Sequence, residues 1–125
     1  MPEKILYVED EPDIRTIARI ALETVGGFNV RLCSSGPEAL EAVAEFSPDC
    51  ILLDVMMPGM DGPTVLKELR RMPHCATTPV IFMTAKVQHS EVAQYKALGA
   101  LDVIPKPFDP MTLAATVRQI LGCPA

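Results

Sequence analysis

Polar side chains follow four of the five short apolar runs in this 125-residue chain, at the point where each run ends. Glu9 and Asp10 follow the first run, Asp54 the third, Thr84 the fourth and Lys106 the fifth. A carboxylate beside an apolar core is costly without a cation, and three carboxylates together raise the pKa of at least one of them. Lys106 can supply one positive charge. Mg²⁺, which binds carboxylate and carbonyl oxygens and keeps several waters, can supply the rest.

The other polar groups indicate which reaction such a site would support. The Thr84 hydroxyl and the Lys106 ammonium are donors with no matching substrate group in the chain. Donors and Mg²⁺ that face a carboxylate nucleophile are typical of phosphoryl transfer, in which positioning and charge neutralisation do most of the work. The sequence therefore predicts phosphoryl chemistry centred on Asp54.

The five apolar runs are the predicted strands that would position these groups, at residues 5–8, 30–32, 50–53, 80–83 and 101–104. Three of them are apolar throughout, as expected for strands that are buried on both faces. The other two carry Arg31 and Asp102, which suit the edges of a sheet.

Amphipathic segments that lie between and after the strands are five predicted helices. The first should end at Gly26-Gly27, the second has capping-box spacing at Ser35 and Glu38, and the third and fifth follow Asp61 and Asp109. The apolar positions expected to face inward are Ile14, Ile17, Ala18, Ala21, Leu22 and Val25, then Leu40 and Val43, then Val65, Leu66 and Leu69, and finally Leu113, Val117, Ile120 and Leu121. The fourth helix, near residues 90–98, has the thinnest apolar stripe, and a weakly anchored helix is one that can move.

Strict alternation of strand and helix predicts an α/β fold with parallel strands, right-handed crossovers and helices on both faces. The expected architecture is a three-layer α/β/α sandwich, doubly wound, in which the order 2-1-3-4-5 places the two charged strands outside. One domain should span residues 1–125, with an ordered core over about 4–121. Ligands bind beyond the carboxyl ends of such strands, so the polar groups should meet at one edge.

Composition excludes several other classes of protein. The net charge is −5 and no basic cluster exceeds Arg70-Arg71, which disfavours direct binding to nucleic acid or an anionic membrane. No segment approaches the roughly 18 apolar residues of a membrane span, and the start of the chain is unlike a signal peptide. The cysteines, at Cys33, Cys50, Cys75 and Cys123, are widely spaced, which favours reduced thiols over zinc or disulfides. We expect a cytoplasmic location.

Four segments, each at a predicted strand end, give the chain a resemblance to a response regulator receiver domain of two-component signalling. The acidic pair of that family matches 7-YVEDE-11 and its phospho-acceptor segment matches 53-LDVMMPGMDG-62. Its Thr-Ala pair matches 83-MTAK-86 and its Lys-Pro pair matches 105-PKPF-108. Any one match is weak, but four in order are highly specific. The resemblance covers essentially the whole chain and implies a flavodoxin-like fold.

The resemblance implies a role for each acidic residue. Asp54 would be the phosphorylated nucleophile and a metal ligand, and Asp10 would be a direct Mg²⁺ ligand. Glu9 would bind the metal mainly through water, and the Met56 carbonyl would complete the protein ligands.

The resemblance also implies how the phosphoryl group would be held. Thr84 would hydrogen-bond to it, the backbone of Ala85 and Met56 would lie beside it, and Lys106 would form an ion pair with it. A cis peptide bond is implied between Lys106 and Pro107, and X-Pro bonds adopt the cis form at low cost.

Two positions depart from the family pattern. Glu9 stands where the family often has Asp, which should change the metal geometry and keep the charge. Val103 stands where many members have Tyr or Phe, an aromatic switch residue that turns as Thr84 engages the phosphate. Without that ring, the switch is expected to be weaker or to depend more on movement of the fourth helix.

The leading interpretation is a regulatory switch, with no catalytic turnover beyond self-directed phosphoryl transfer and autodephosphorylation. A sensor histidine kinase or phosphotransfer protein would donate the phosphoryl group to Asp54. The surface around the fourth helix, fifth strand and fifth helix would then bind a downstream target or an output domain in a longer chain. The sequence leaves open whether the domain stands alone and whether it forms a weak dimer.

Three alternatives compete with this interpretation. A phosphatase with an aspartyl-phosphate intermediate needs an acid two residues after the nucleophile, where this chain has Met56. A flavin-binding electron carrier needs a phosphate-binding loop after the first strand, where Glu9, Asp10 and Glu11 would repel phosphate. A receiver-like module that binds its partner independently of phosphate also stays open.

Overall fold

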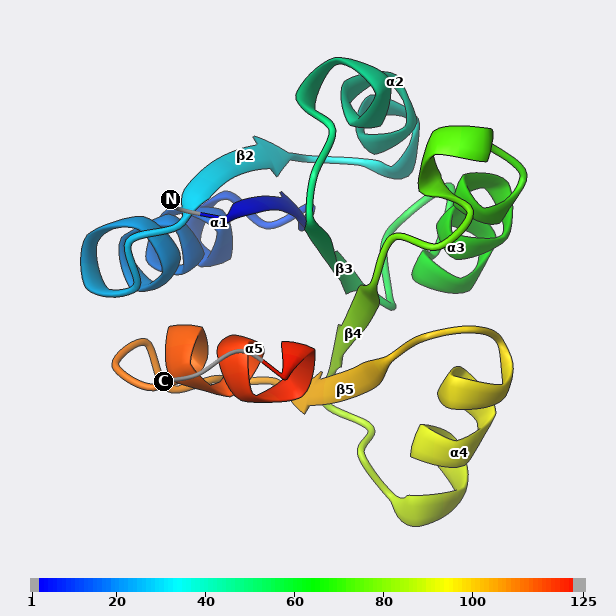
Figure 1. Cartoon of the computed structure of the whole chain (residues 1–125). Helices are drawn as coiled ribbons and strands as arrows, with labels where there is room; N and C mark the ends of the chain where they lie inside the picture. Colours follow the sequence, from blue (N-terminus) through cyan, green and yellow to red (C-terminus); the bar gives the residue numbers. More distant parts are fainter. Residues whose placement is uncertain (1–2, 123–125) are drawn as a thin grey trace.

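The computed structural model describes residues 3–122, which form a five-stranded parallel sheet between two layers of helices (Figure 1). The strand order is β2-β1-β3-β4-β5, which confirms the predicted architecture and places the two charged strands at the edges. The strands are β1 (Lys4–Val8), β2 (Asn29–Cys33), β3 (Cys50–Asp54), β4 (Val80–Thr84) and β5 (Asp102–Pro105). The helices are α1 (Pro12–Arg19), η1 (Ile20–Val25), α2 (Gly36–Phe46), α3 (Gly62–Arg70), η2 (Pro73–Cys75), α4 (His89–Ala97) and α5 (Leu113–Leu121).

Two apolar clusters cover the two faces of the sheet, because successive strand residues point to opposite sides. Leu6, Ile51 and Phe82 pack on the face that α2 and α3 cover. Tyr7 and Leu52 pack on the opposite face, which α1, η1 and α5 cover. They directly follow Leu6 and Ile51 in the sequence. Figure 1 shows α1 and α5 together on this second side of the sheet. The central strands are therefore buried on both faces, as their apolar runs predict.

The first predicted helix differs from expectation in its second half. The α-helix ends at Arg19 and η1 continues as a π-helix, whose wider turns shift every later side chain around the axis. Ala18, Ala21 and Leu22 are buried as predicted, but Ile17 is 44% exposed and Val25 is 42% exposed. The prediction that these last two face inward is wrong. Val25 lies in the π-helix, where the period of 3.6 residues no longer holds, whereas Ile17 lies in the α-helix before it, at a surface pocket that Ile14 and Phe108 also line.

The caps at the starts of α2 and α3 are largely those that the sequence predicts. The Ser35 hydroxyl accepts a hydrogen bond from the Glu38 backbone N–H at 3.3 Å, while the Glu38 carboxylate accepts from Ser34 instead of returning to Ser35. At the start of α3, Asp61 Oδ1 accepts from the backbone N–H of Thr64 at 3.0 Å and from its hydroxyl at 2.6 Å. These contacts satisfy backbone donors that a helix start leaves unpaired.

The fourth and fifth helices differ in how firmly they pack. None of the residues described in α4 is buried, in line with its thin apolar stripe. In α5, Leu113 and Val117 are buried, and Ile120 and Leu121 pack partly buried against the same cluster.

No helix in residues 3–122 is long and apolar enough to cross a membrane. Within the same residues Cys33, Cys50 and Cys75 are buried free thiols; Cys123 lies outside the described residues.

Candidate functional site

The carboxyl ends of β1, β3 and β4 lie side by side at one edge of the sheet and carry the buried polar residues Glu9, Asp54 and Thr84. Glu9 directly follows β1, while Asp54 and Thr84 are the last residues of β3 and β4. Because the strands are parallel and adjacent, residues that are far apart in the sequence meet here. The sheet topology therefore produces the convergence that the sequence predicts.

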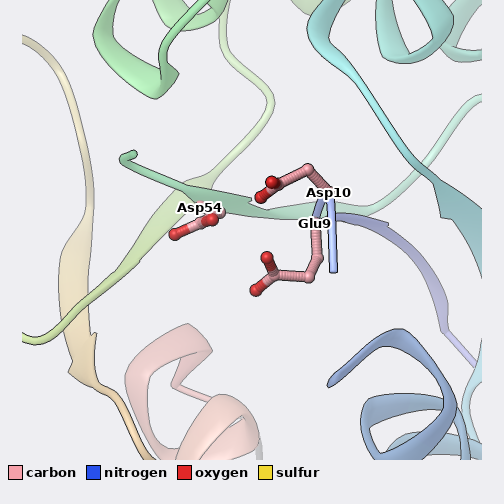
Figure 2. Close-up of side chains that lie close together, drawn as sticks. All are labelled: Glu9, Asp10 and Asp54. Atoms are coloured by element: carbon pink, nitrogen blue, oxygen red, sulfur yellow. The ribbon is translucent and has the colours of Figure 1, made fainter. Parts of the chain in front are cut away.

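Three carboxylates form an acidic cluster at this edge. Glu9, Asp10 and Asp54 each offer one carboxylate oxygen, and these oxygens all lie within 4.8 Å of one another. Figure 2 shows the three side chains close together at the ends of β1 and β3. Glu9 and Asp54 are buried and Asp10 is half-buried. Water screens such charges poorly, so a cation is required to hold all three ionised.

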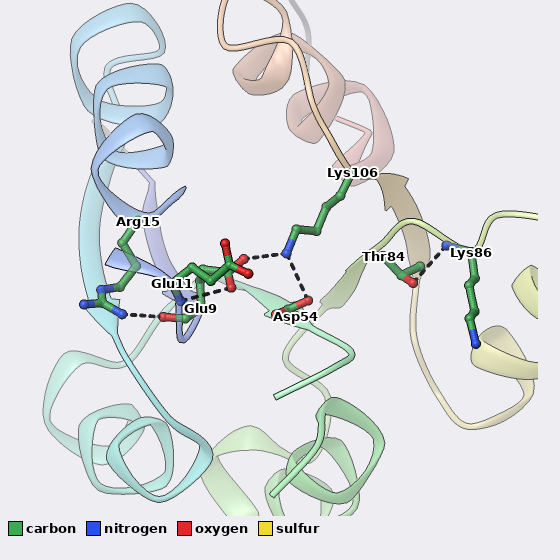
Figure 3. A network of polar contacts seen from close by, with 7 residues as sticks. All are labelled: Glu9, Glu11, Arg15, Asp54, Thr84, Lys86 and Lys106. Carbon is green, nitrogen blue, oxygen red and sulfur yellow. Dashed lines mark hydrogen bonds and ion pairs between the residues drawn. The ribbon is translucent and has the colours of Figure 1, made fainter. Parts of the chain in front are cut away.

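Lys106 supplies one such cation from the end of β5. Its Nζ lies 2.7 Å from Glu9 Oε1 and 3.3 Å from Asp54 Oδ1. Figure 3 marks both contacts with dashed lines. The Lys106 backbone N–H donates to the Thr84 carbonyl at 2.9 Å, and its peptide bond to Pro107 is cis. The ammonium thus reaches the acidic cluster from a loop that is joined to the neighbouring strand.

Burial sets the protonation behaviour of this cluster. It raises the pKa of Glu9 to about 7, against the hydrogen bond from Lys106 and with the charge of Asp54 adding to the rise. Burial likewise raises the pKa of Asp54, although the Lys106 charge opposes it. Partial burial lowers the pKa of Lys106, but the Glu9 hydrogen bond and the Asp54 charge produce a net rise. The single positive charge of Lys106 is therefore not enough to keep the pKa values of Glu9 and Asp54 at their ordinary values.

This donor set fits Mg²⁺, the ion that the sequence predicts. Mg²⁺ prefers one or two carboxylates with water completing an octahedron, and the cluster offers three carboxylate oxygens at a partly open edge.

A pocket of about 220 Å³ opens beside the cluster. Its lining includes all five of the residues predicted to surround a phosphoryl group: Asp54, Met56, Thr84, Ala85 and Lys106. Asp54 is the residue that belongs to both the acidic cluster and this pocket. A group bound to its carboxylate would therefore have the acidic cluster on one side and hydrogen-bond donors on the other.

The loop between β3 and α3 shapes one wall of the pocket. A side chain at Gly62 would bring its Cβ within 2.6 Å of the Asp54 carbonyl oxygen and 2.9 Å of the Val55 Cα. Glycine therefore lets the start of α3 pack against the end of β3, and the Gly62 N–H donates to the Val55 carbonyl at 2.9 Å. Met56 is 67% exposed at the pocket mouth.

Three residues near the site have positions that the sequence did not assign. Arg15 of α1 donates from Nη1 to the Glu9 backbone carbonyl at 2.8 Å, and the Glu11 backbone N–H donates to Glu9 Oε2 at 3.3 Å. The Lys86 backbone N–H donates to the Thr84 hydroxyl at 3.1 Å, while its side chain points away from Asp54 (Figure 3). Their contacts run mainly through backbone groups, which leave no signal in the residue types.

Val103, the predicted switch position, lies outside the group of residues that meet at Asp54. It is half-buried on β5 and packs against the cluster beneath α2 and α3, where Tyr95 of α4 also packs. Tyr95 makes an edge-to-face contact with Phe82 of β4, with ring centroids 5.3 Å apart. An aromatic ring is thus present between β4 and α4, contributed by the helix.

A sequence model of the response regulator receiver domain matches residues 5–118. The chain is 40% identical over 121 residues to the alkaline phosphatase synthesis transcriptional regulatory protein PhoP of Bacillus subtilis, a match that covers 97% of this chain and 49% of the relative. It is 38% identical over 121 residues to the DNA-binding response regulator MtrA of Mycolicibacterium smegmatis, covering 97% of this chain and 51% of the relative. The chain thus spans about half the length of these curated relatives.

Solved structures share the fold over nearly the whole chain. The chemotaxis response regulator CheY4 of Vibrio cholerae matches with a TM-score of 0.89 at 31% identity, covering 96% of this chain and 99% of that chain.

Proposed function

The chain belongs to the response regulator receiver domain family, and from this premise we propose that Asp54 accepts a phosphoryl group which switches the surface that the domain presents to a protein partner. The donor would be the phosphohistidine of a sensor histidine kinase or of a phosphotransfer protein. The recipient of the signal would be a protein surface, either an output domain joined to this one or a separate target. The domain would act as a regulator and not as an enzyme with external substrates.

One observation carries the proposal: the Asp54 carboxylate is shared between the acidic cluster and the donor-lined pocket. A phosphoryl acceptor needs a nucleophilic oxygen, nearby positive charge and donors for the phosphoryl oxygens. Asp54 supplies the oxygen and Lys106 lies 3.3 Å from it. Thr84 and Ala85 line the same pocket.

In the proposed transfer, an Asp54 carboxylate oxygen forms a bond to phosphorus as the bond from phosphorus to the donor imidazole nitrogen breaks. The imidazole keeps the electron pair of the broken bond. Lys106 stabilises the negative charge on the phosphoryl oxygens, the Thr84 hydroxyl donates to one of them, and the backbone of Ala85 and Met56 lies beside them.

Mg²⁺ would supply the remaining positive charge when bound. Asp10 and Asp54 would hold it directly with the Met56 carbonyl, and Glu9 would hold it through water, as the family resemblance implies. In autodephosphorylation, a water oxygen would form a bond to phosphorus as the bond from phosphorus to the Asp54 oxygen breaks, which releases inorganic phosphate and returns Asp54 to its free carboxylate.

The switch would pass from Thr84 into the β4–α4 segment. Thr84 ends β4 and leads directly to α4, the helix with no buried residue among those described. The Thr84 hydroxyl can donate to the phosphoryl group while it still accepts from the Lys86 backbone N–H, so a shift of Thr84 toward the phosphoryl group would move the segment that leads to α4 with it. The surface around α4, β5 and α5 would change as a result.

An aspartyl-phosphate phosphatase is the less favoured function, because that mechanism needs an acid where Met56 stands. A phosphate-independent module is also less favoured, since it gives no reason for a buried cluster of Glu9, Asp54 and Lys106. The relative MtrA is described as DNA-binding. We propose no nucleic-acid contact for this domain, because its net charge is −5.

The proposal is tested by incubating the protein with a small acyl phosphate, with and without Mg²⁺, and recording its intact mass. We expect a Mg²⁺-dependent phosphoryl adduct that Asp54→Asn abolishes. Asp61→Asn is a matched control, because it makes the same chemical change in the following segment and keeps a side chain that can cap α3. An unlabelled wild type, under conditions that label a known receiver domain, would favour the phosphate-independent module instead.

A further inference from the structure

Tyr7 in β1 carries a hydroxyl that has no hydrogen-bond partner among residues 3–122. Its side chain is completely buried, so bulk water does not reach the hydroxyl. Buried donors are almost always paired in folded proteins, and an unpaired one is a substantial cost to the state that contains it. This hydroxyl therefore requires an explanation.

The position of Tyr7 connects it to the acidic cluster. Tyr7 lies two residues before Glu9, so both side chains leave β1 on the same face. In the strand register Tyr7 lies beside Leu52, which is two residues before Asp54 on β3. Tyr7 and Leu52 thus form the layer directly beneath Glu9 and Asp54, and the phenol hydroxyl is the polar atom of that pair.

The negative charges of Glu9 and Asp54 act on the Tyr7 hydroxyl. Burial raises the pKa of Tyr7, and the negative charges of Glu9 and Asp54 raise it further. The phenol keeps its proton at neutral pH, so it can donate a hydrogen bond to a nearby acceptor.

Glu9, whose charge reaches the Tyr7 hydroxyl, is a group whose own hydrogen bonding would change with the state of the site. In the structure its Oε1 accepts from Lys106 Nζ at 2.7 Å. The same ammonium lies 3.3 Å from Asp54 Oδ1, and in the proposed function it pairs with a phosphoryl group on Asp54. When Lys106 moves to that anion, Glu9 loses a donor at a place where it is fully buried.

We propose that Tyr7 is a positioning residue whose hydroxyl donates to the Glu9 carboxylate when Lys106 turns from Glu9 to an anion bound at Asp54. One hydrogen bond then pairs the Tyr7 hydroxyl, which had no acceptor, with the Glu9 carboxylate, which has lost the donor Lys106. Because this bond is missing from the resting state, it stabilises the anion-bound state specifically. The inference rests on the proposed function and adds to it a residue beneath the site that holds Glu9 in place.

The first test compares the affinity of wild type and Tyr7→Phe for beryllofluoride, a mimic of a phosphoryl group on a carboxylate, by calorimetric titration at fixed Mg²⁺. We expect Tyr7→Phe to bind roughly five- to tenfold more weakly, where tenfold corresponds to about 1.4 kcal/mol. In urea unfolding without either ion, the variant should be as stable as wild type or more so, since it lacks the unpaired donor. Tyr95→Phe removes the hydroxyl of the only other tyrosine in the sequence, and should bind as wild type does.

The second test observes the hydroxyl itself. Protein labelled with ¹³C at the tyrosine ζ carbon gives two signals, which the two Tyr→Phe variants assign. Beryllofluoride should shift the Tyr7 signal in wild type and leave it in place in Asp54→Asn.

Equal beryllofluoride affinities for wild type and Tyr7→Phe, or an unmoved Tyr7 signal in a saturated sample, would overturn this inference while the phosphoryl adduct on Asp54 still stands. A variant that is less stable without ions but binds equally well would assign Tyr7 a purely structural role, and would also overturn it. Absence of the phosphoryl adduct in wild type would overturn the proposed function and this inference together.

Discussion

The pocket beside Asp54 lies between two flanks that are anchored very differently. One flank is the β3–α3 segment, which contributes Met56, and the other is the β4–α4 segment, which contributes Thr84, Ala85 and Lys86. On the first flank, α3 is held by an N-cap and by four buried residues: Gly62, Val65, Leu66 and Leu69. On the second flank, none of the residues described in α4 is buried.

A few contacts hold α4 to the rest of the domain. Tyr95 packs its ring edge-to-face on Phe82. Lys96 Nζ lies 3.7 Å from Asp102 Oδ1 of β5. At the end of α4, the Gly99 carbonyl accepts from Arg70 Nη2 of α3 at 3.2 Å. These are one aromatic contact, one exposed ion pair and one hydrogen bond, whereas α3 has an apolar face in the core.

This difference separates two tasks of the proposed switch. The firmly packed flank holds the nucleophile loop in place, which phosphoryl transfer requires. The loosely packed flank carries Thr84 and Ala85, which would contact the phosphoryl group, and it can rearrange at a small cost in free energy. A modest gain at the phosphoryl group is then enough to shift the population of α4 conformations.

The largest expected effect comes from removing a core side chain of α3. Leu66→Ala should lower the free energy of unfolding by about 2–5 kcal/mol, because it removes buried apolar surface and leaves a cavity. Leu98→Ala is the matched substitution at the end of α4, where the side chain is 55% exposed, and should cost less than about 1 kcal/mol. Urea unfolding measures both. Similar losses for the two variants would contradict the difference between the flanks.

Much of the site was predictable because its residues end strands. Glu9, Asp54 and Thr84 each follow an apolar run, and parallel strands bring such ends to one edge. The weak anchoring of α4 was also predictable, since few of its positions are apolar. These features depend on local sequence and on one rule of topology, so no contact has to be known in advance.

Other features depend on contacts that residue types do not encode. Val25 is exposed in the π-helix after Arg19, and Ile17 is exposed in the α-helix before it, although the spacing of both fits a buried α-helical face. The hydrogen bond from Arg15 ends on a backbone carbonyl, which every residue has. The unpaired Tyr7 hydroxyl is recognisable only once all its neighbours are in place, because in the sequence Tyr7 is one more residue of an apolar strand.

A smaller effect is expected from Tyr95, the main apolar anchor of α4. Tyr95→Ala should lower the free energy of unfolding by about 1–2 kcal/mol, through lost burial and the lost ring pair with Phe82. Backbone amides of α4 should also exchange faster than in wild type, whereas those of α3 should not, and hydrogen exchange followed by NMR separates the two helices. Tyr95→Phe keeps the ring and should leave both rates unchanged. Faster exchange spread equally over α3 and α4 would show that the flanks open as one unit.

The N-cap of α3 should contribute about 1 kcal/mol, so Asp61→Ala should lower the free energy of unfolding by that amount at neutral pH. The hydrogen bonds from the Thr64 hydroxyl and backbone lower the pKa of Asp61. Its contribution is therefore fully present above the ordinary carboxyl pKa and is lost as the pH falls through the lowered value.

Two controls sharpen this comparison of helix starts. Asp61→Asn keeps an acceptor and should retain most of the stability. Gln88→Ala, at the start of α4, keeps the backbone N–H that donates to Glu91 at 3.3 Å and should cost only a few tenths of a kcal/mol. A cost for Gln88→Ala that equals the cost for Asp61→Ala would mean that α4 is capped as firmly as α3.

The smallest effect should come from the ion pair between Lys96 and Asp102. The two side chains are 51% and 37% exposed, so water and salt screen their attraction, and Lys96→Ala should cost no more than about 0.5 kcal/mol. Urea unfolding at low and high salt checks this, and the small difference between wild type and variant should shrink further as salt is added. A salt-independent loss well above 1 kcal/mol would mean that this pair anchors α4 to β5. The second flank would then be held electrostatically, and movement of α4 would first require Lys96 to leave Asp102.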